Sequence, residues 1–95
     1  MEKFKVEHKT TTIKEYNASD LPIYKVWDSG LSEWYYRCRI LDGRLKCDVI
    51  KMSNNMDSIS YDTTTLSCVF NEDNITVDED AWRNAMHRLI NNIRI

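Results

Sequence analysis

Apolar and polar residues alternate on both sides of Asp42 and Gly43, and this alternation predicts a β-hairpin over residues 33–52. An Asp-Gly pair accepts the positive φ angles of a type I′ turn, which joins two antiparallel strands through two residues. The turn sets the register and places Cys38 opposite Cys47. A slip of one residue would mix apolar and polar side chains on both faces, so the turn and the alternation predict the same register.

The two faces of this hairpin differ in character, because successive side chains of a strand point to opposite faces. The first face is apolar and carries Trp34, Tyr36, Cys38, Ile40, Leu45, Cys47 and Val49. The second face is mainly charged and carries Arg37, Arg39, Lys46 and Asp48, with Tyr35 and Ile50 at its far end. We expect the first face to be buried and the second to face solvent, as is common in antiparallel sheets.

Shorter alternating segments predict further strands before and after the hairpin. Phe4 and Val6 alternate with charged residues, and a segment over residues 11–16 is expected to continue this strand after a bend. Pro22 has no backbone N–H to donate, so a strand over residues 23–27 should begin directly after it or at a sheet edge. Two more strands are predicted from the alternation of Ile59 with Tyr61 and from that of Leu66, Cys68 and Phe70. Together these segments predict a mostly antiparallel meander of about six short strands.

The last part of the chain predicts one amphipathic helix over about residues 78–93. Two starts fit the sequence, since Thr76 and Glu79 have the spacing of a capping box and Asp78 is an alternative N-cap. At about 100° per residue, the apolar side chains of this segment fall on one stripe. The stripe consists of Trp82, Ala85, Met86, Leu89, Ile90 and Ile93. It should pack on the apolar face of the hairpin, which makes residues 1–95 a single two-layer α+β domain.

Length and charge narrow the kinds of partner that the chain attracts. The sequence has 95 residues, 42% of them hydrophobic, and a net charge of −2 at pH 7, which is typical of one globular domain. This balance gives no general electrostatic attraction to nucleic acid or to an anionic membrane. No apolar run approaches the roughly 18 residues of a membrane span, and the first residues lack the apolar centre of a secretion signal. We therefore expect no membrane contact and a cytoplasmic location.

Catalytic, metal and cofactor motifs are missing from the sequence. His8 and His87 are the only histidines, and no nucleophile is placed beside either of them by the sequence pattern. The acidic residues within 71–80 lack the glycine and the terminal acid that a calcium-binding EF-hand loop requires at fixed positions. We therefore expect no enzymatic activity, no metal ion and no cofactor.

The three cysteines contain no Cys-x-x-Cys pair, which argues against a zinc site and against a disulfide framework. Reduced, mostly buried thiols are the expectation. A cross-strand disulfide between Cys38 and Cys47 is the alternative that the predicted register leaves open.

The charged face of the hairpin is the surface on which we place binding. The candidate residues are Tyr35, Arg37, Arg39 and Lys46. Arginine and tyrosine are enriched at protein interfaces, and aromatic side chains also form base-stacking platforms, while a merely solvated face is the alternative.

Asn, Ile, Lys and Tyr total 29 residues against 12 for Gly, Ala, Pro and Arg, a bias expected from an AT-rich gene. The sequence thus predicts a small protein-binding module, an inhibitor or regulator of phage or mobile-element type that binds a host macromolecule. A nucleic-acid or nucleotide-binding domain that uses the same Tyr/Arg face is the alternative.

Overall fold

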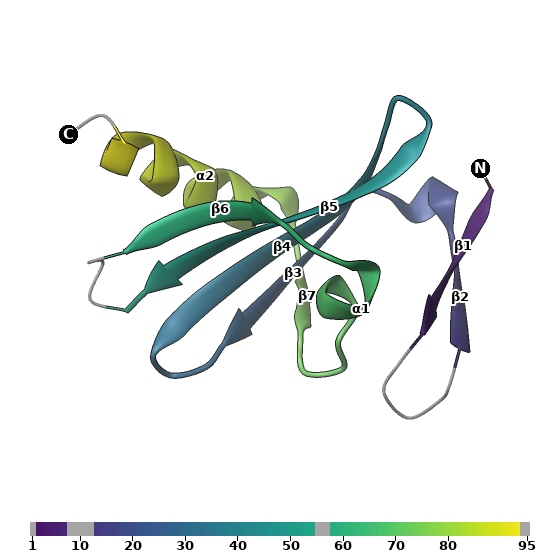
Figure 1. Cartoon of the computed structure of the whole chain (residues 1–95), viewed down its shortest axis with the longest axis horizontal. Coiled ribbons are helices and arrows are strands. Elements are labelled where there is room, and N and C mark those ends of the chain that lie inside the picture. The colour runs from purple at the N-terminus through teal and green to yellow at the C-terminus, as the bar shows by residue number, and fades with distance from the viewer. Residues whose placement is uncertain (1, 8–12, 55–57, 94–95) are drawn as a thin grey trace.

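The computed structural model describes residues 2–7, 13–54 and 58–93, and its elements are shown in Figure 1. In chain order they are β1 (Lys3–Glu7), β2 (Ile13–Asn17), the short 3₁₀-helix η1 (Ala18–Asp20), β3 (Ile23–Asp28), β4 (Ser32–Leu41), β5 (Arg44–Ser53), β6 (Ile59–Thr63), α1 (Leu66–Val69), β7 (Ile75–Val77) and α2 (Glu79–Ile93). Strands β3 to β6 form a meander, and β7 returns to pair with β3, so the five-stranded sheet has the order β6-β5-β4-β3-β7. Every neighbouring pair in this sheet is antiparallel. The α+β class, the antiparallel sheet and the C-terminal helix packed on it are confirmed.

The central hairpin has the predicted register. Strands β4 and β5 pair Cys38 with Cys47 and Leu41 with Arg44 across the turn. Asp42 has a φ of 53° and Gly43 a φ of 75°, the two positive angles that a type I′ turn requires. A local turn signal and a period of two therefore determined the longest pair of strands in the sheet.

The N-terminal strands form a separate hairpin rather than one bent strand. Strand β2 turns back antiparallel to β1 and pairs Tyr16 with Phe4, whose rings stack with centroids 5.6 Å apart. Phe4 and Val6 are buried, as their alternation with charged residues predicts. They pack on the apolar face of β4 and β5, where Tyr36 and Cys38 are also buried. His8 lies outside the described residues.

The prediction of a strand from Leu66 to Phe70 is wrong, because this segment forms the short helix α1. The side-chain oxygen of Thr65 accepts a hydrogen bond from the backbone N–H of Cys68 at 3.3 Å, which caps the helix. Val69 and Phe70 are buried and Leu66 packs beside them, an i, i+3, i+4 spacing that places all three on one side of a helix. Cys68, which a strand would have placed on the same face as Leu66 and Phe70, is exposed.

Helix α2 begins at Glu79, with Asp78 as its cap. An oxygen of the Asp78 carboxylate accepts a hydrogen bond from the N–H of Ala81 at 3.2 Å. Thr76 lies in β7 instead of a capping box. The predicted stripe is buried at Trp82, Ala85 and Leu89 and half-buried at Met86, while Ile90 is 45% exposed and the side chain of Ile93 lies outside the described part of the chain.

The expectation that α2 covers the apolar face of the hairpin is wrong. The helix packs on the opposite face, against Ile50 and Met52, with Tyr24, Tyr35 and Ile59 at the margin of the cluster. Figure 1 shows α2 running beside β6 and β5, while the β1–β2 hairpin lies at the far end of the molecule. The apolar face is covered instead by Phe4, Val6 and the residues of α1. Both faces of β5 are therefore buried, from Cys47 through Ile50 without interruption.

Replacing Gly43 by valine should lower the free energy of unfolding by at least about 1 kcal/mol, because a β-branched residue resists a positive φ. A Cβ at this position would meet no atom within 4 Å, so backbone strain alone would cause the loss. Gly43→Asn is the matched control, since asparagine tolerates this region and should cost less. Urea unfolding of both variants measures the difference, and equal midpoints for valine and glycine would contradict the assigned turn.

Candidate functional site

The four residues predicted to bind a partner share one face of β4 and β5, as the register requires. Tyr35, Arg37 and Arg39 alternate along β4, and Lys46 is the partner of Arg39 on β5. This is the face on which α2 packs. Their availability therefore depends on how much of the face the helix covers.

Arg37 is held inside the molecule. Its Nε and Nη2 atoms donate to the two carboxylate oxygens of Asp48 at 3.0 and 2.6 Å, a bidentate pair across β4 and β5. The Asp48 side chain is fully buried, and that of Arg37 is 15% exposed. Tyr61 of β6 donates its hydroxyl to the same carboxylate at 2.5 Å. The guanidinium also lies over the Trp82 ring of α2, 4.5 Å from the centroid, so its contacts with Asp48 and Trp82 are both internal.

Burial and the contacts with Asp48 determine the protonation of Arg37 and Tyr61. Burial alone would lower the pKa of Arg37, but the hydrogen bonds and the charge of Asp48 outweigh it and raise the pKa. Burial raises the pKa of Tyr61, and its hydrogen bond to Asp48 raises it further. Arg37 stays charged and Tyr61 stays a hydrogen-bond donor throughout the physiological range.

Tyr35 is also engaged within the fold. Its ring packs at the margin of the cluster under α2, and its hydroxyl donates to Oε2 of Glu33 at 2.8 Å. Burial and then this hydrogen bond raise the pKa of Tyr35 to about 12. Arg39 is half-buried and Lys46 is exposed, both near the turn of the hairpin. The structure thus brings the four residues together, with Lys46 exposed, Tyr35 and Arg39 half-buried, and Arg37 held in its ion pair.

The backbone of β6 presents a different surface, at the edge of the sheet. The N–H of Thr64 donates to the carbonyl of Cys47 at 3.0 Å, and the N–H of Ser53 donates to the carbonyl of Ser58 at 2.9 Å. Backbone groups alternate in direction along an antiparallel strand. Given the register of β5 and β6, residues 60 and 62 therefore bond to β5, and residues 59, 61 and 63 point away from the sheet.

No strand of the described chain pairs with this outer edge. Ile59 and Tyr61 direct both N–H and C=O outward, by the alternation just described. At Thr63 the outward N–H is occupied by the side chain of Asp62, whose Oδ1 accepts it at 2.8 Å. Four backbone groups over Ile59 to Tyr61 are thus free to pair with an added strand.

An apolar groove of about 370 Å³ runs between this edge and α2. It is lined by Ile59, Ser60, Tyr61, Met86 and Leu89. Tyr61 remains 42% exposed, although its hydroxyl reaches the buried Asp48. The lining contains no charged side chain, and we name it the β6 groove. The sequence pattern identifies the alternation of Ile59 and Tyr61, but no local signal shows that β6 ends the sheet beside α2.

The structure also shows the surroundings of His87, Cys38 and Cys47. His87 is exposed on α2. Cys38 and Cys47 face each other as buried thiols, and the hydrogen bond between them, with burial, raises the pKa of Cys38. Within residues 2–7, 13–54 and 58–93, no three His, Cys, Asp or Glu side chains gather as a metal site would need. In the same ranges, no helix is long and apolar enough to span a membrane.

Comparison with known proteins finds no match: no protein-family model, no curated protein and no solved structure matches this chain.

Removing one member of the buried ion pair should strongly destabilise the fold. Arg37→Leu leaves the Asp48 carboxylate buried without its counter-ion, and we expect a loss of about 3 to 5 kcal/mol in unfolding free energy. The double variant Arg37→Leu with Asp48→Leu removes both charges and should recover most of this loss. Chemical denaturation measures both, with Lys46→Leu as the surface control. A loss below about 1 kcal/mol for Arg37→Leu would mean that the pair is a solvated surface contact.

Proposed function

We propose that this protein is a binding module for other proteins, and that its partner adds an extended segment to the free edge of β6. The observation that carries the proposal is the unpaired backbone of Ile59 and Tyr61 directly beside the β6 groove. Strand addition of this kind obtains affinity from main-chain hydrogen bonds and specificity from pockets for alternate side chains. The edge offers the first and the groove offers the second.

The geometry of β6 indicates which side chains of the partner would enter the groove. Ile59 and Tyr61 pair with Met52 and Ile50 of β5, whose side chains pack under α2, so their own side chains lie on the α2 side of the sheet. A strand added beside β6 continues this alternation, and every second side chain points toward Met86. Since the groove lining is apolar, the preferred partner segment alternates apolar residues with polar ones.

The alternative of nucleic-acid binding draws less support from the geometry. Phosphate contacts need exposed cations, and base stacking needs open aromatic faces. Arg37 is paired with a buried carboxylate and Tyr35 packs under α2, which leaves Arg39, Arg44 and Lys46 as the cations near the turn. The net charge of −2 adds no general attraction to an anionic polymer.

A module that works by occupying a segment of its partner acts as an inhibitor or regulator, and this is the role that we propose. The AT-rich residue bias supports a phage or mobile-element source and a host macromolecule as the target. Buried thiols at Cys38 and Cys47 suit a reducing compartment, so we extend the proposal to a cytoplasmic location.

Selection from a displayed library of random peptides tests the proposal without a known partner. Enriched peptides should alternate apolar with polar residues, and in NMR titrations they should shift the amide signals of Ile59, Tyr61 and Met86. Met86→Glu places a charge in the groove and should weaken binding by at least about tenfold. Asn84→Glu adds the same charge at an exposed position of α2 and should leave binding unchanged. Peptides that shift Arg39 and Lys46 instead, or the absence of any enriched peptide, would contradict the proposal.

A further inference from the structure

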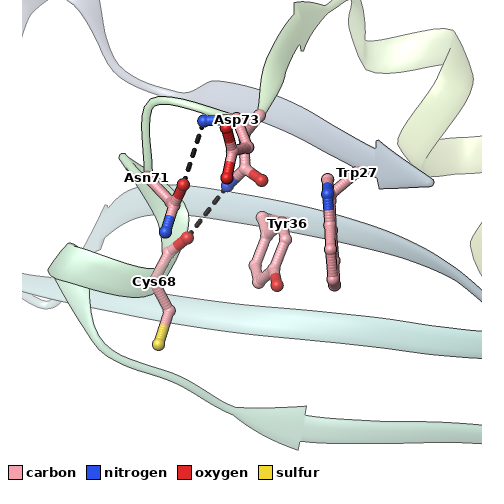
Figure 2. A pocket seen from close by; sticks show the side chains of 6 residues that line it. Trp27, Tyr36, Cys68, Asn71 and Asp73 are labelled. Atoms are coloured by element: carbon pink, nitrogen blue, oxygen red, sulfur yellow. Dashed lines mark hydrogen bonds between the residues drawn. The ribbon is translucent and has the colours of Figure 1, made fainter. Parts of the chain in front are cut away.

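A second pocket lies on the opposite face of the sheet, where the loop between α1 and β7 closes over β3 and β4 (Figure 2). It has a volume of about 130 Å³ and is lined by Trp27, Tyr36, Cys68, Asn71, Asp73 and Asn74. Figure 2 shows the rings of Trp27 and Tyr36 standing next to each other on the sheet, with the loop that carries Asn71 and Asp73 opposite them. Pockets for drug-sized ligands have about 300 to 1,000 Å³, so this space admits a single small head group.

The loop wall of the pocket is fixed by its own hydrogen bonds. Nδ2 of Asn74 donates to the carbonyls of Cys68 and Val69 at 2.9 and 2.8 Å, which ties the loop to the end of α1. Oδ1 of Asn71 accepts the N–H of Asp73 at 2.9 Å. The amide nitrogen of Asn74 and the amide oxygen of Asn71 are thus bonded before any ligand arrives. The carboxylate of Asp73 is different, because no group of residues 2–7, 13–54 and 58–93 donates to it or forms an ion pair with it.

Aromatic rings elsewhere on this side of the molecule already hold ammonium groups. Nζ of Lys51 lies 4.5 Å from the centroid of Trp34, and Trp34 packs against Trp27 with centroids 5.9 Å apart. Nζ of Lys25 lies 5.7 Å from the centroid of Phe70. Among the described residues, no cation occupies the faces of Trp27 and Tyr36 in the same way.

Charge favours a cation in this pocket. Glu72 and Asp73 lie in the loop, and the sequence from residue 57 to residue 80 contains no lysine or arginine. Lys25, the β3 partner of Tyr36, donates its ammonium to Oγ1 of Thr76 at 2.8 Å and does not line the pocket. The pocket is thus lined by the buried ring of Tyr36, the partly exposed ring of Trp27 and the exposed carboxylate of Asp73, and no cationic side chain of the described chain lines it.

We propose that this pocket binds a quaternary ammonium head group between Trp27, Tyr36 and Asp73. The rings attract the cation through their negative faces, and the carboxylate supplies the counter-charge. A trimethylated ammonium suits the site, because it has no N–H groups that need acceptors and its methyl groups can pack against the two rings. The head group comes either from a trimethylated lysine of a protein or from a free choline-like molecule. This site lies on the face opposite the β6 groove and does not depend on the function proposed for that groove.

Titration with choline chloride at constant ionic strength tests the site, followed by the amide and indole signals of the full-length protein. Choline should give saturable shifts at Trp27 and Asp73, whereas 3,3-dimethylbutan-1-ol, its uncharged analogue of the same shape, should give none. A second titration uses an acetylated, amidated trimethyllysine. Tighter binding of the lysine derivative identifies a protein as the source of the head group, and tighter binding of choline identifies a small molecule. Absence of saturable shifts with both cations, or equal binding of the alcohol, would overturn the proposal.

Variants of the pocket separate its two contributions. Asp73→Asn keeps the shape of the side chain and removes the charge, and should weaken choline binding by about tenfold. Trp27→Leu should weaken it by about two- to thirtyfold, the range that corresponds to one cation–π contact. Glu72→Gln removes the neighbouring charge outside the pocket lining and is the matched control, with unchanged binding expected. If Asp73→Asn and Glu72→Gln lose affinity equally, the cation is attracted by general loop charge and the proposed site is wrong.

Discussion

The arrangement of this protein depends on one buried carboxylate. Asp48 is fully enclosed at the centre of β5, and Arg37 and Tyr61 satisfy its oxygens from the strands on either side. Burying an isolated carboxylate at this depth would cost too much free energy. Helix α2 can cover this face of the sheet only because Arg37 pairs with Asp48 through two hydrogen bonds. The guanidinium in turn supports the ring of Trp82, which anchors α2. Three strands and the helix thus meet at a single ion pair.

Both faces of β5 are covered, and this limits where the molecule can bind a partner. With α2 on one side of β5, and β1, β2 and α1 on the other, the sheet has little open face left beside its turn. Two of the features that remain accessible are the β6 edge and a loop pocket. The edge of β6 has free backbone groups at Ile59 and Tyr61 beside an apolar groove, and the pocket under the α1–β7 loop has two aromatic faces and a carboxylate. The β6 groove is apolar, whereas the pocket is aromatic and acidic and lies on the opposite face, so the two suit different ligands.

The sequence predicts the elements that are determined by interactions between residues close together in the chain. The Asp42-Gly43 turn and the alternation of β4 and β5 determine the hairpin within a short segment, and the cap and stripe of α2 are likewise local. The segment after Thr65 is ambiguous in sequence because Leu66 and Phe70 fit both a strand and a helix, and the Thr65 hydroxyl favours the helix. Hydrophobicity does not predict that this face is covered, because Arg37 and Asp48 are charged residues that become buried only as an ion pair across β4 and β5. The β6 edge likewise has no local sequence signal, because it depends on the order of strands in the whole sheet.

Amide hydrogen exchange along β6 of the free protein tests most directly whether the sheet ends at an open edge. The N–H groups of Ser60 and Asp62 point to β5 and should exchange slowly, whereas those of Ile59 and Tyr61 point to solvent and should exchange far faster. This residue-by-residue alternation is the predicted result. Slow exchange at all four positions in a protein shown to be monomeric would mean that another segment of the chain covers the edge, and would contradict the account.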